Sequence, residues 1–100
     1  MKIKVLSKRA GEPPRSVNIE NSLENLQKHV GGYIETVTIA EDAVIICNEE
    51  GLLLDLPYNC TICGRPFVGD IIMCGVQGDE FADIPASWDT LKLMFPELWE

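Results

Sequence analysis

The residues best suited to chemistry are Cys60 and Cys63, which form a C-x-x-C-G motif with Gly64. The motif resembles a zinc knuckle, in which glycine lets backbone N–H groups approach the two thiolates. A tetrahedral zinc ion needs four ligands, so Cys47 and Cys74, or the same motif of a second chain, would have to complete the site. No second C-x-x-C is present. We favour the simpler interpretation of four reduced cysteines that act as small apolar side chains, with no metal and no other cofactor.

Nucleophilic or redox chemistry at these cysteines is disfavoured. Low-pKa thiols of redox motifs lie at helix N-termini, whereas Gly64 and Pro66 would break a helix here. His29 is the only histidine, and it lies beside the apolar stripe of a predicted helix, with no Asp or Asn at an informative spacing. We therefore expect a surface or half-buried helix histidine, and a protein that is not an enzyme.

Two acidic clusters could hold a divalent cation or a general acid–base pair. One is Asn48–Glu50, and the other combines Asp79, Glu80, Asp83 and Asp89. Consecutive carboxylates in a turn do not converge on one point, and the regular spacing of a calcium-binding loop is absent. We interpret both clusters as solvated turns. The sequence also lacks a P-loop, a G-x-G-x-x-G motif and a G-x-S-x-G motif.

The composition narrows the class of protein. Sixteen acidic and 8 basic side chains give a net charge of -8, which repels nucleic-acid backbones, so no direct DNA or RNA binding is expected. With 46% hydrophobic residues, 100 residues can build one core, which predicts a single domain over residues 1–100. No apolar run approaches the roughly 18 residues that span a bilayer, and the N-terminal residues lack a signal-peptide stretch. We expect a soluble protein of the cytoplasm without membrane contact.

Hydrophobic patterns predict an α+β fold with a mixed, mostly antiparallel sheet. Strands are predicted near residues 2–6, 17–19, 33–39, 43–48, 52–55, 67–76 and 81–84. Residues 55–65 contain Pro57, Asn59 and Gly64 and are predicted to form a long loop.

Two helices complete this fold. The first is predicted near residues 22–30, with Asn21 as its N-cap in a capping box with Glu24, and with Gly31 and Gly32 at its C-terminus. The residues expected to pack on the sheet are Leu23, Leu26 and Val30.

The second helix is predicted near residues 87–95. Ser87 can cap it, and Pro96 ends or kinks it. Its apolar stripe consists of Trp88, Leu91, Met94 and Phe95.

Several short motifs occur in a fixed order along the chain. They are Gly31-Gly32-Tyr33-Ile34-Glu35, Asn48-Glu49-Glu50-Gly51, Leu56-Pro57-Tyr58-Asn59, Val68-Gly69-Asp70 and Gly78-Asp79-Glu80-Phe81-Ala82-Asp83-Ile84. In this order, over nearly the full length, they resemble the domain-of-unknown-function family 3846, which phages and mobile elements of Gram-positive bacteria carry. The resemblance implies a small α+β domain of such an origin and supplies no catalytic residues. The chain departs from the family at Cys60 and Cys63, in a variable loop, and at Asp70, where threonine is expected.

The first functional hypothesis is a non-enzymatic binding protein of a phage or mobile element that occupies a host protein, for example one that guards against foreign DNA. An acidic domain can dock into a basic groove built for nucleic acid. The predicted contact surface is exposed and irregular, and its residues are Asn48, Glu49, Glu50, Tyr58 and Asn59. The sequence is also compatible with a homodimer.

The second hypothesis is a small-molecule or zinc-binding domain. Here the loop Leu56–Arg65 would frame a pocket, with Tyr58 as its apolar wall and with Asn59 and Arg65 as its directed polar contacts.

Overall fold

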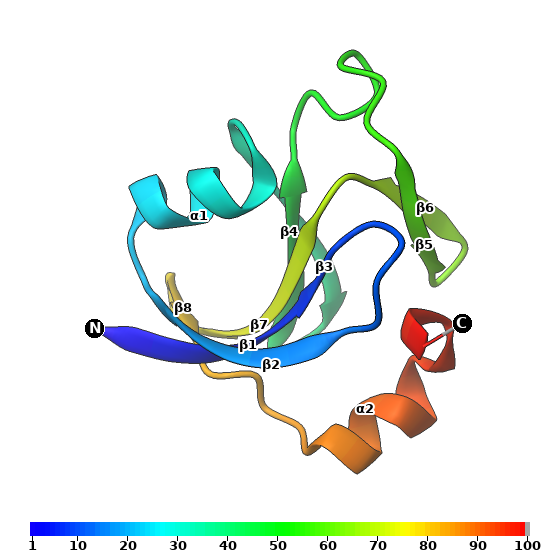
Figure 1. The fold of residues 1–100 in the computed structure, drawn as a ribbon. Coiled ribbons are helices and arrows are strands. Elements are labelled where there is room, and N and C mark those ends of the chain that lie inside the picture. Colours follow the sequence, from blue (N-terminus) through cyan, green and yellow to red (C-terminus); the bar gives the residue numbers. More distant parts are fainter. Residues whose placement is uncertain (100) are drawn as a thin grey trace.

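The computed structural model describes residues 1–99 and is built around a six-stranded main sheet (Figure 1). Its strands are β1 (Lys2–Lys8), β2 (Arg15–Glu20), β3 (Ile34–Ala40), β4 (Ala43–Asn48), β7 (Ile71–Gln77) and β8 (Glu80–Ala82). The order across the sheet is β2-β1-β7-β4-β3, and β8 pairs with β7. Every pairing among the described residues is antiparallel. The mostly antiparallel sheet and the α+β fold are thus confirmed.

A separate two-stranded hairpin follows in sequence between β4 and β7. It consists of β5 (Tyr58–Ile62) and β6 (Arg65–Val68). Cys63 and Gly64 join the two strands with φ values of 52° and 78°, and such positive values are typical of tight hairpin turns. The predicted loop over residues 55–65 is therefore wrong for most of its length. The strand predicted over residues 67–76 is divided between two sheets, because Gly69 (φ 75°) and Asp70 interrupt it.

Both predicted helices are confirmed, as α1 (Leu23–Val30) and α2 (Trp88–Met94). Ser87 caps α2 as predicted, and a 3-10 helix, η1 (Pro96–Trp99), follows it. None of the helices within residues 1–99 has the length and apolar character needed to cross a bilayer.

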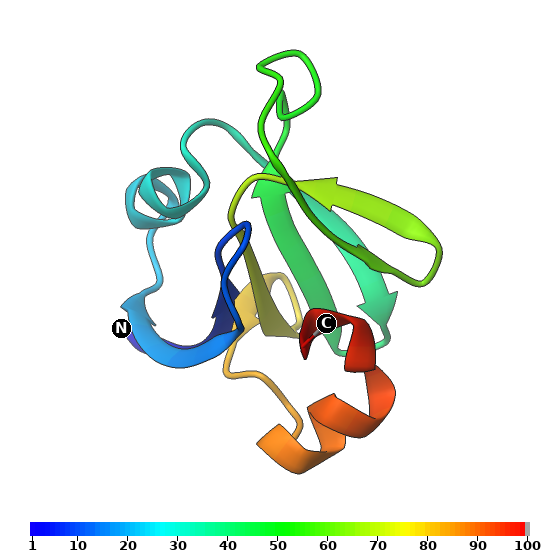
Figure 2. The same cartoon turned by 45° about the vertical axis from the view of Figure 1, so that its right-hand side comes forward.

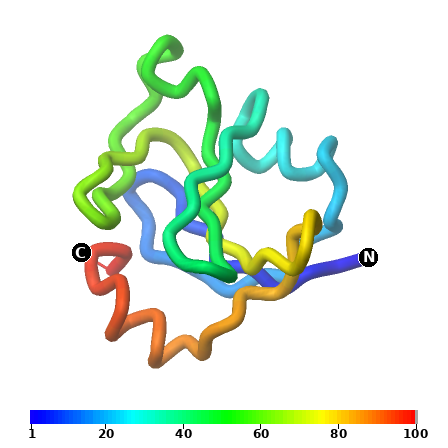
Figure 3. The backbone as a smooth tube through the Cα atoms, turned by 180° about the vertical axis from the view of Figure 1, so that it is seen from behind, coloured from blue at the N-terminus to red at the C-terminus, as the bar shows by residue number. Residues whose placement is uncertain are grey.

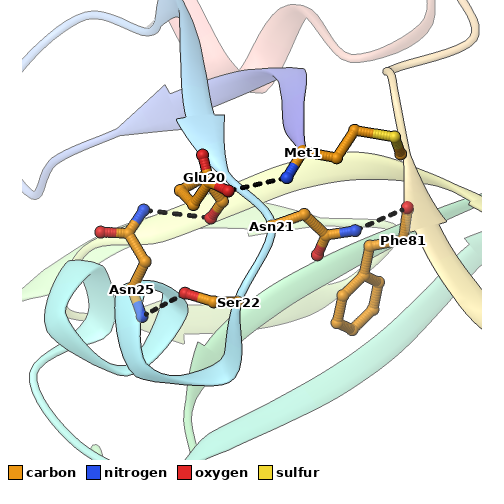
Figure 4. Close-up of polar contacts among 6 residues, drawn as sticks. All are labelled: Met1, Glu20, Asn21, Ser22, Asn25 and Phe81. Carbon is orange, nitrogen blue, oxygen red and sulfur yellow. Dashed lines mark hydrogen bonds and ion pairs between the residues drawn. The ribbon is translucent and has the colours of Figure 1, made fainter.

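The start of α1 differs from the prediction by one residue. The hydroxyl of Ser22, not the side chain of Asn21, accepts the capping hydrogen bond, from the backbone N–H of Asn25 at 3.2 Å (Figure 4). Asn21 instead donates to the backbone oxygen of Phe81, and Asn25 donates to that of Glu20, each at 3.1 Å. At the other end, Gly31 adopts the predicted left-handed conformation, with φ 80°.

Each face of the main sheet carries its own apolar cluster. The first face packs against α1, and its buried residues are Ile3, Val5, Ile19, Leu26, Val30, Val44, Ile46, Ile72 and Cys74. The second face packs against the β5–β6 hairpin, α2 and η1, and its buried residues are Leu6, Ile45, Cys47, Cys60, Ile62, Phe67, Ile71, Met73, Leu91, Phe95 and Leu98. Figures 2 and 3 show α1 on one side of the sheet and the hairpin with α2 on the other.

The helix prediction was correct for Leu26 and Val30, which are buried, and wrong for Leu23, which is 59% exposed. Leu23 is the first residue of α1, and only Leu26 and Val30 of this helix are buried.

Candidate functional site

The segment between β4 and β5, residues 49–57, protrudes from one end of the molecule (Figures 1 and 2). We call it the leucine loop. The strand predicted at residues 52–55 is wrong, because these residues form turns in which Leu52 and Leu53 are 84% and 85% exposed and Leu54 is also exposed. A run of three leucines favours a buried strand by composition, so sequence reasoning missed these residues as surface groups. The available signal was their position between acidic residues and turn formers.

Backbone hydrogen bonds fold the leucine loop into consecutive turns. The N–H of Leu54 donates to the carbonyl oxygen of Glu50 at 2.9 Å, and the N–H of Leu56 donates to that of Gly51 at 3.0 Å. Asp55 takes a left-handed conformation, with φ 55°, between them. Asp tolerates this conformation better than a β-branched or apolar residue does. The three leucines therefore point outward from a defined turn.

The base of the leucine loop is anchored to the rest of the fold on both sides. The N–H of Glu49 donates to the carbonyl oxygen of Tyr33 at 2.8 Å, and the N–H of Gly69 donates to that of Pro57 at 2.7 Å. Leu56 is half-buried and packs on Gly69, where an added Cβ would lie 2.8 Å from its Cδ1 atom. One leucine of the loop thus serves as its anchor, whereas the other three remain exposed.

Asn48 was expected on the exposed contact surface, and the structure corrects this, because Asn48 is only 5% exposed. Its Nδ2 donates to the carbonyl oxygen of Val30 at 3.1 Å, and its Oδ1 accepts from the N–H of Glu50 at 2.8 Å. Asn48 therefore links the end of α1 to the start of the leucine loop. Both polar atoms of its side-chain amide make hydrogen bonds within the fold.

Asn59 is corrected in the same way, since it is 8% exposed and points into the interior. Its amide donates to the backbone oxygens of Lys8 and Gly69. These two hydrogen bonds hold the amide nitrogen of Asn59 in the interior. The other polar atom of the side chain, Oδ1, is buried and has no hydrogen-bond partner among residues 1–99.

The other residues of the predicted surface are exposed. Glu49, Glu50 and Asp55, which flank the three leucines in the sequence, are exposed as well. Tyr58 is exposed at the start of β5, and its hydroxyl lies 2.7 Å from Oγ1 of Thr61. The structure thus brings three acidic groups and an aromatic ring to the neighbourhood of the leucine loop.

A groove of about 350 Å³ runs beside the leucine loop. Its lining includes Glu35, Leu52, Leu53, Arg65, Pro66 and Phe67. Arg65 lies 3.4 Å from a carboxylate oxygen of Glu35 and also stacks over the ring of Phe67. Tyr58 and Asn59 do not line this groove. The three residues proposed to frame a small-molecule pocket, Tyr58, Asn59 and Arg65, therefore do not converge on it.

The C-x-x-C motif is split between the interior and the surface. Cys60 is buried in the second-face cluster, whereas Cys63 is exposed at the hairpin turn. Burial raises the pKa of Cys47 to about 11 and that of Cys74 to about 12, and it also raises the pKa of Cys60. Protonated thiols are poor nucleophiles and poor metal ligands. Within residues 1–99 no three His, Cys, Asp or Glu side chains are grouped closely enough to hold a metal ion.

The remaining candidates have separate positions. Asp83 accepts a hydrogen bond from the backbone N–H of Lys4 at 2.8 Å, and Asp89 lies in the first turn of α2. His29 is half-buried in the last turn of α1, as expected for a helix histidine.

Comparison with known proteins identifies one family. The sequence model of the family described as Domain of unknown function (DUF3846) matches residues 1–95. No curated protein and no solved structure matches the chain. Because the family model covers nearly the whole chain, the protein belongs to the DUF3846 family.

Proposed function

We propose that this protein is a non-enzymatic binding protein of phage or mobile-element origin, which contacts a host protein through the leucine loop. The observation that carries the proposal is the exposure of Leu52 and Leu53 on a turn that is anchored at both ends. Clustered exposed apolar side chains mark interaction surfaces in soluble proteins. Because the loop is already folded, binding would cost little additional ordering entropy.

The apolar side chains provide the affinity in this proposal. Burying one leucine side chain contributes about 1.5–3 kcal/mol, so Leu52 and Leu53 together could contribute several kcal/mol to binding. Tyr58 lies nearby and adds an exposed aromatic ring, a residue type enriched at interfaces. The partner should therefore offer an apolar pocket.

The carboxylates near the exposed leucines indicate which charge the rim of the partner's pocket should carry. Glu49, Glu50 and Asp55 are exposed, and the chain as a whole carries a net charge of -8. Complementary charge accelerates association and selects against acidic partners. We infer a host protein whose apolar pocket has a basic rim, such as a nucleic-acid groove of a protein that acts on foreign DNA.

Capture from a host lysate, followed by affinity measurement on the purified partner, tests this function. The double variant Leu52→Ser/Leu53→Ser should lose the partner, since it removes the apolar contact from an exposed turn without affecting the core. Leu93→Ser is the matched control, because Leu93 is equally exposed but lies on α2. It should bind like the wild type.

Charge reversal separates the electrostatic contribution to binding from the apolar contribution of the leucines. Glu49→Lys/Glu50→Lys should slow association, and the association rate of the wild type should fall as salt rises. If the Leu52→Ser/Leu53→Ser variant keeps full affinity for the captured protein, the leucine loop is not the contact surface.

A further inference from the structure

A second site lies on the opposite side of the sheet from the β5–β6 hairpin. A pocket of about 270 Å³ opens between α1, the end of β1 and the start of β7. Its polar and charged lining consists of Ser7, Arg9, Asn25, Lys28, His29 and Asp70. We propose that this pocket binds a small molecule through a phosphate group. This proposal is independent of the leucine loop.

The pocket arises from the pattern of β1. Ile3 and Val5 point to the α1 face and are buried in its cluster. Alternation places Ser7 on the same face, and Arg9 follows just beyond the end of the strand. Apolar residues would close this end of the face, but the sequence instead places a hydroxyl and a guanidinium there. Ile72 of β7 remains as an apolar wall.

The charged residues of the pocket are mostly basic, whereas the protein as a whole is acidic. The chain has 16 acidic and 8 basic side chains, yet this pocket gathers Arg9, Lys28 and the single histidine around one carboxylate. That carboxylate, of Asp70, accepts a hydrogen bond from the backbone N–H of Ala10 at 3.1 Å. It thereby holds the connection that carries Arg9.

The basic groups are not explained by helix stability alone. Lys28 and His29 lie in the last turn of α1, where positive charge interacts favourably with the helix dipole. Lys28 also makes a long ion pair with Glu24, at 3.8 Å between two exposed side chains. Arg9 is outside the helix, and it makes no ion pair within 4.0 Å among the described residues 1–99. Arg9 therefore brings to the pocket a positive charge that no ion pair among these residues neutralises.

A phosphate monoester is the anion that fits this lining. It carries about two negative charges and several strong acceptor oxygens, whereas a carboxylate carries one charge. Arginine provides a planar fork for two of those oxygens, and lysine adds a point charge. Ser7 and Asn25 bring a hydroxyl and an amide to the same pocket. The volume lies just below the roughly 300–1,000 Å³ of sites for drug-sized ligands, which indicates a small ligand.

The test is an NMR titration of the isotope-labelled full chain, in which the amide chemical shifts report binding. The probes are ribose 5-phosphate, inorganic phosphate and unphosphorylated ribose. We expect saturable shifts at residues 7, 9, 25, 28, 29 and 70 with both phosphates and none with ribose. Arg9→Ala should weaken binding at least about ten-fold, because it removes a charge-assisted hydrogen bond. Arg15→Ala is the matched control, since Arg15 is exposed on β2 and does not line the pocket.

Each outcome has a definite meaning. Tighter binding of ribose 5-phosphate than of inorganic phosphate supports an organic phosphate ligand, and equal binding supports recognition of the anion itself. Absence of saturable shifts, shifts spread over other basic residues, or unchanged binding in Arg9→Ala would overturn the proposal. The Leu52→Ser/Leu53→Ser variant should bind phosphate normally, which keeps failure of this site distinct from failure of the leucine loop.

Discussion

Asn59 donates a hydrogen bond from its side-chain amide to the backbone carbonyl oxygen of Lys8, at 2.9 Å. A second bond from the same nitrogen reaches the carbonyl oxygen of Gly69, at 2.7 Å. The first bond spans 51 residues of sequence and ties the β5–β6 hairpin to the end of β1 in the main sheet. Because Asn59 is buried, solvent does not replace these bonds when they are lost.

Asn59→Ala should lower the free energy of unfolding by about 1–3 kcal/mol, since it removes two buried hydrogen bonds to backbone carbonyl oxygens. Asn59→Asp should be at least as damaging, because it removes both N–H groups and buries a carboxylate. Urea denaturation measures both changes. Asn18→Ala, on the exposed side of β2, is the control and should change stability by less than about 0.5 kcal/mol. Equal effects at the two asparagines would contradict this role of Asn59.

Two leucines three residues apart in α1 should respond very differently to truncation. Leu26 is 2% exposed against the sheet, so Leu26→Ala should cost about 2–5 kcal/mol and clearly lower the melting temperature. Leu23→Ala should cost less than about 0.5 kcal/mol, because that side chain is mostly in solvent. Thermal melting of both variants, with Gln27→Ala as a further control, checks the orientation of the helix. Similar losses at both leucines would show that α1 is rotated from its described position.

The four cysteines should differ sharply in reactivity. Cys63 is exposed at the hairpin turn, whereas Cys47, Cys60 and Cys74 are buried. A thiol-specific chromogenic disulfide reagent should therefore modify one thiol per folded chain rapidly and all four after unfolding in guanidinium. Cys63→Ser should abolish the rapid phase. A second rapidly reacting thiol in the folded Cys63→Ser protein would contradict this arrangement.

The buried thiols should make stability fall at alkaline pH. Burial raises the pKa of Cys47 to about 11 and that of Cys74 to about 12, whereas a thiol in an unfolded chain titrates near about 8.5. Below that pH the thiols are protonated in both the folded and the unfolded chain, so their full contribution to the free energy of unfolding is present. Above it the unfolded chain releases protons first, so the free energy of unfolding decreases until the folded thiols titrate.

Urea midpoints measured between pH 8 and 10.5 check this sign. Cys74→Ala lowers stability at neutral pH by removing a buried side chain, but its midpoint should decline less steeply with pH than that of the wild type. Cys63→Ala removes an exposed thiol and should retain the wild-type slope. Identical slopes in the two variants would refute the linkage.

Local patterns in the sequence were sufficient to predict most of the helices and strands. The alternation of Ile3 and Val5 with lysines predicts β1, and the spacing of Leu26 and Val30 predicts α1. The N-cap was misplaced by one residue, at Asn21 instead of Ser22, because both side chains can cap a helix. Such patterns depend on a few neighbouring residues, which explains why they are reliable.

The candidate site was less predictable, because it depends on contacts between distant parts of the chain. Asn48 and Asn59 are polar residues typical of surface loops, but each is buried by segments that the local sequence does not specify. Leu52 and Leu53 have the composition of a buried strand and yet lack a sheet neighbour. Whether a side chain faces the core or the solvent in these segments is decided by tertiary packing.

The position of β7 in the sheet has a consequence for folding. This strand, near the end of the chain, pairs with β1, β4 and β8 and so joins the two halves of the main sheet. On the ribosome, the β1–β2 and β3–β4 hairpins can form early, but no strand pairing joins them until β7 has emerged. Since such non-local pairings must close long loops, they slow folding, and the two hairpins expose their unpaired edges during that interval. The last third of the chain therefore controls when the first third becomes protected from aggregation.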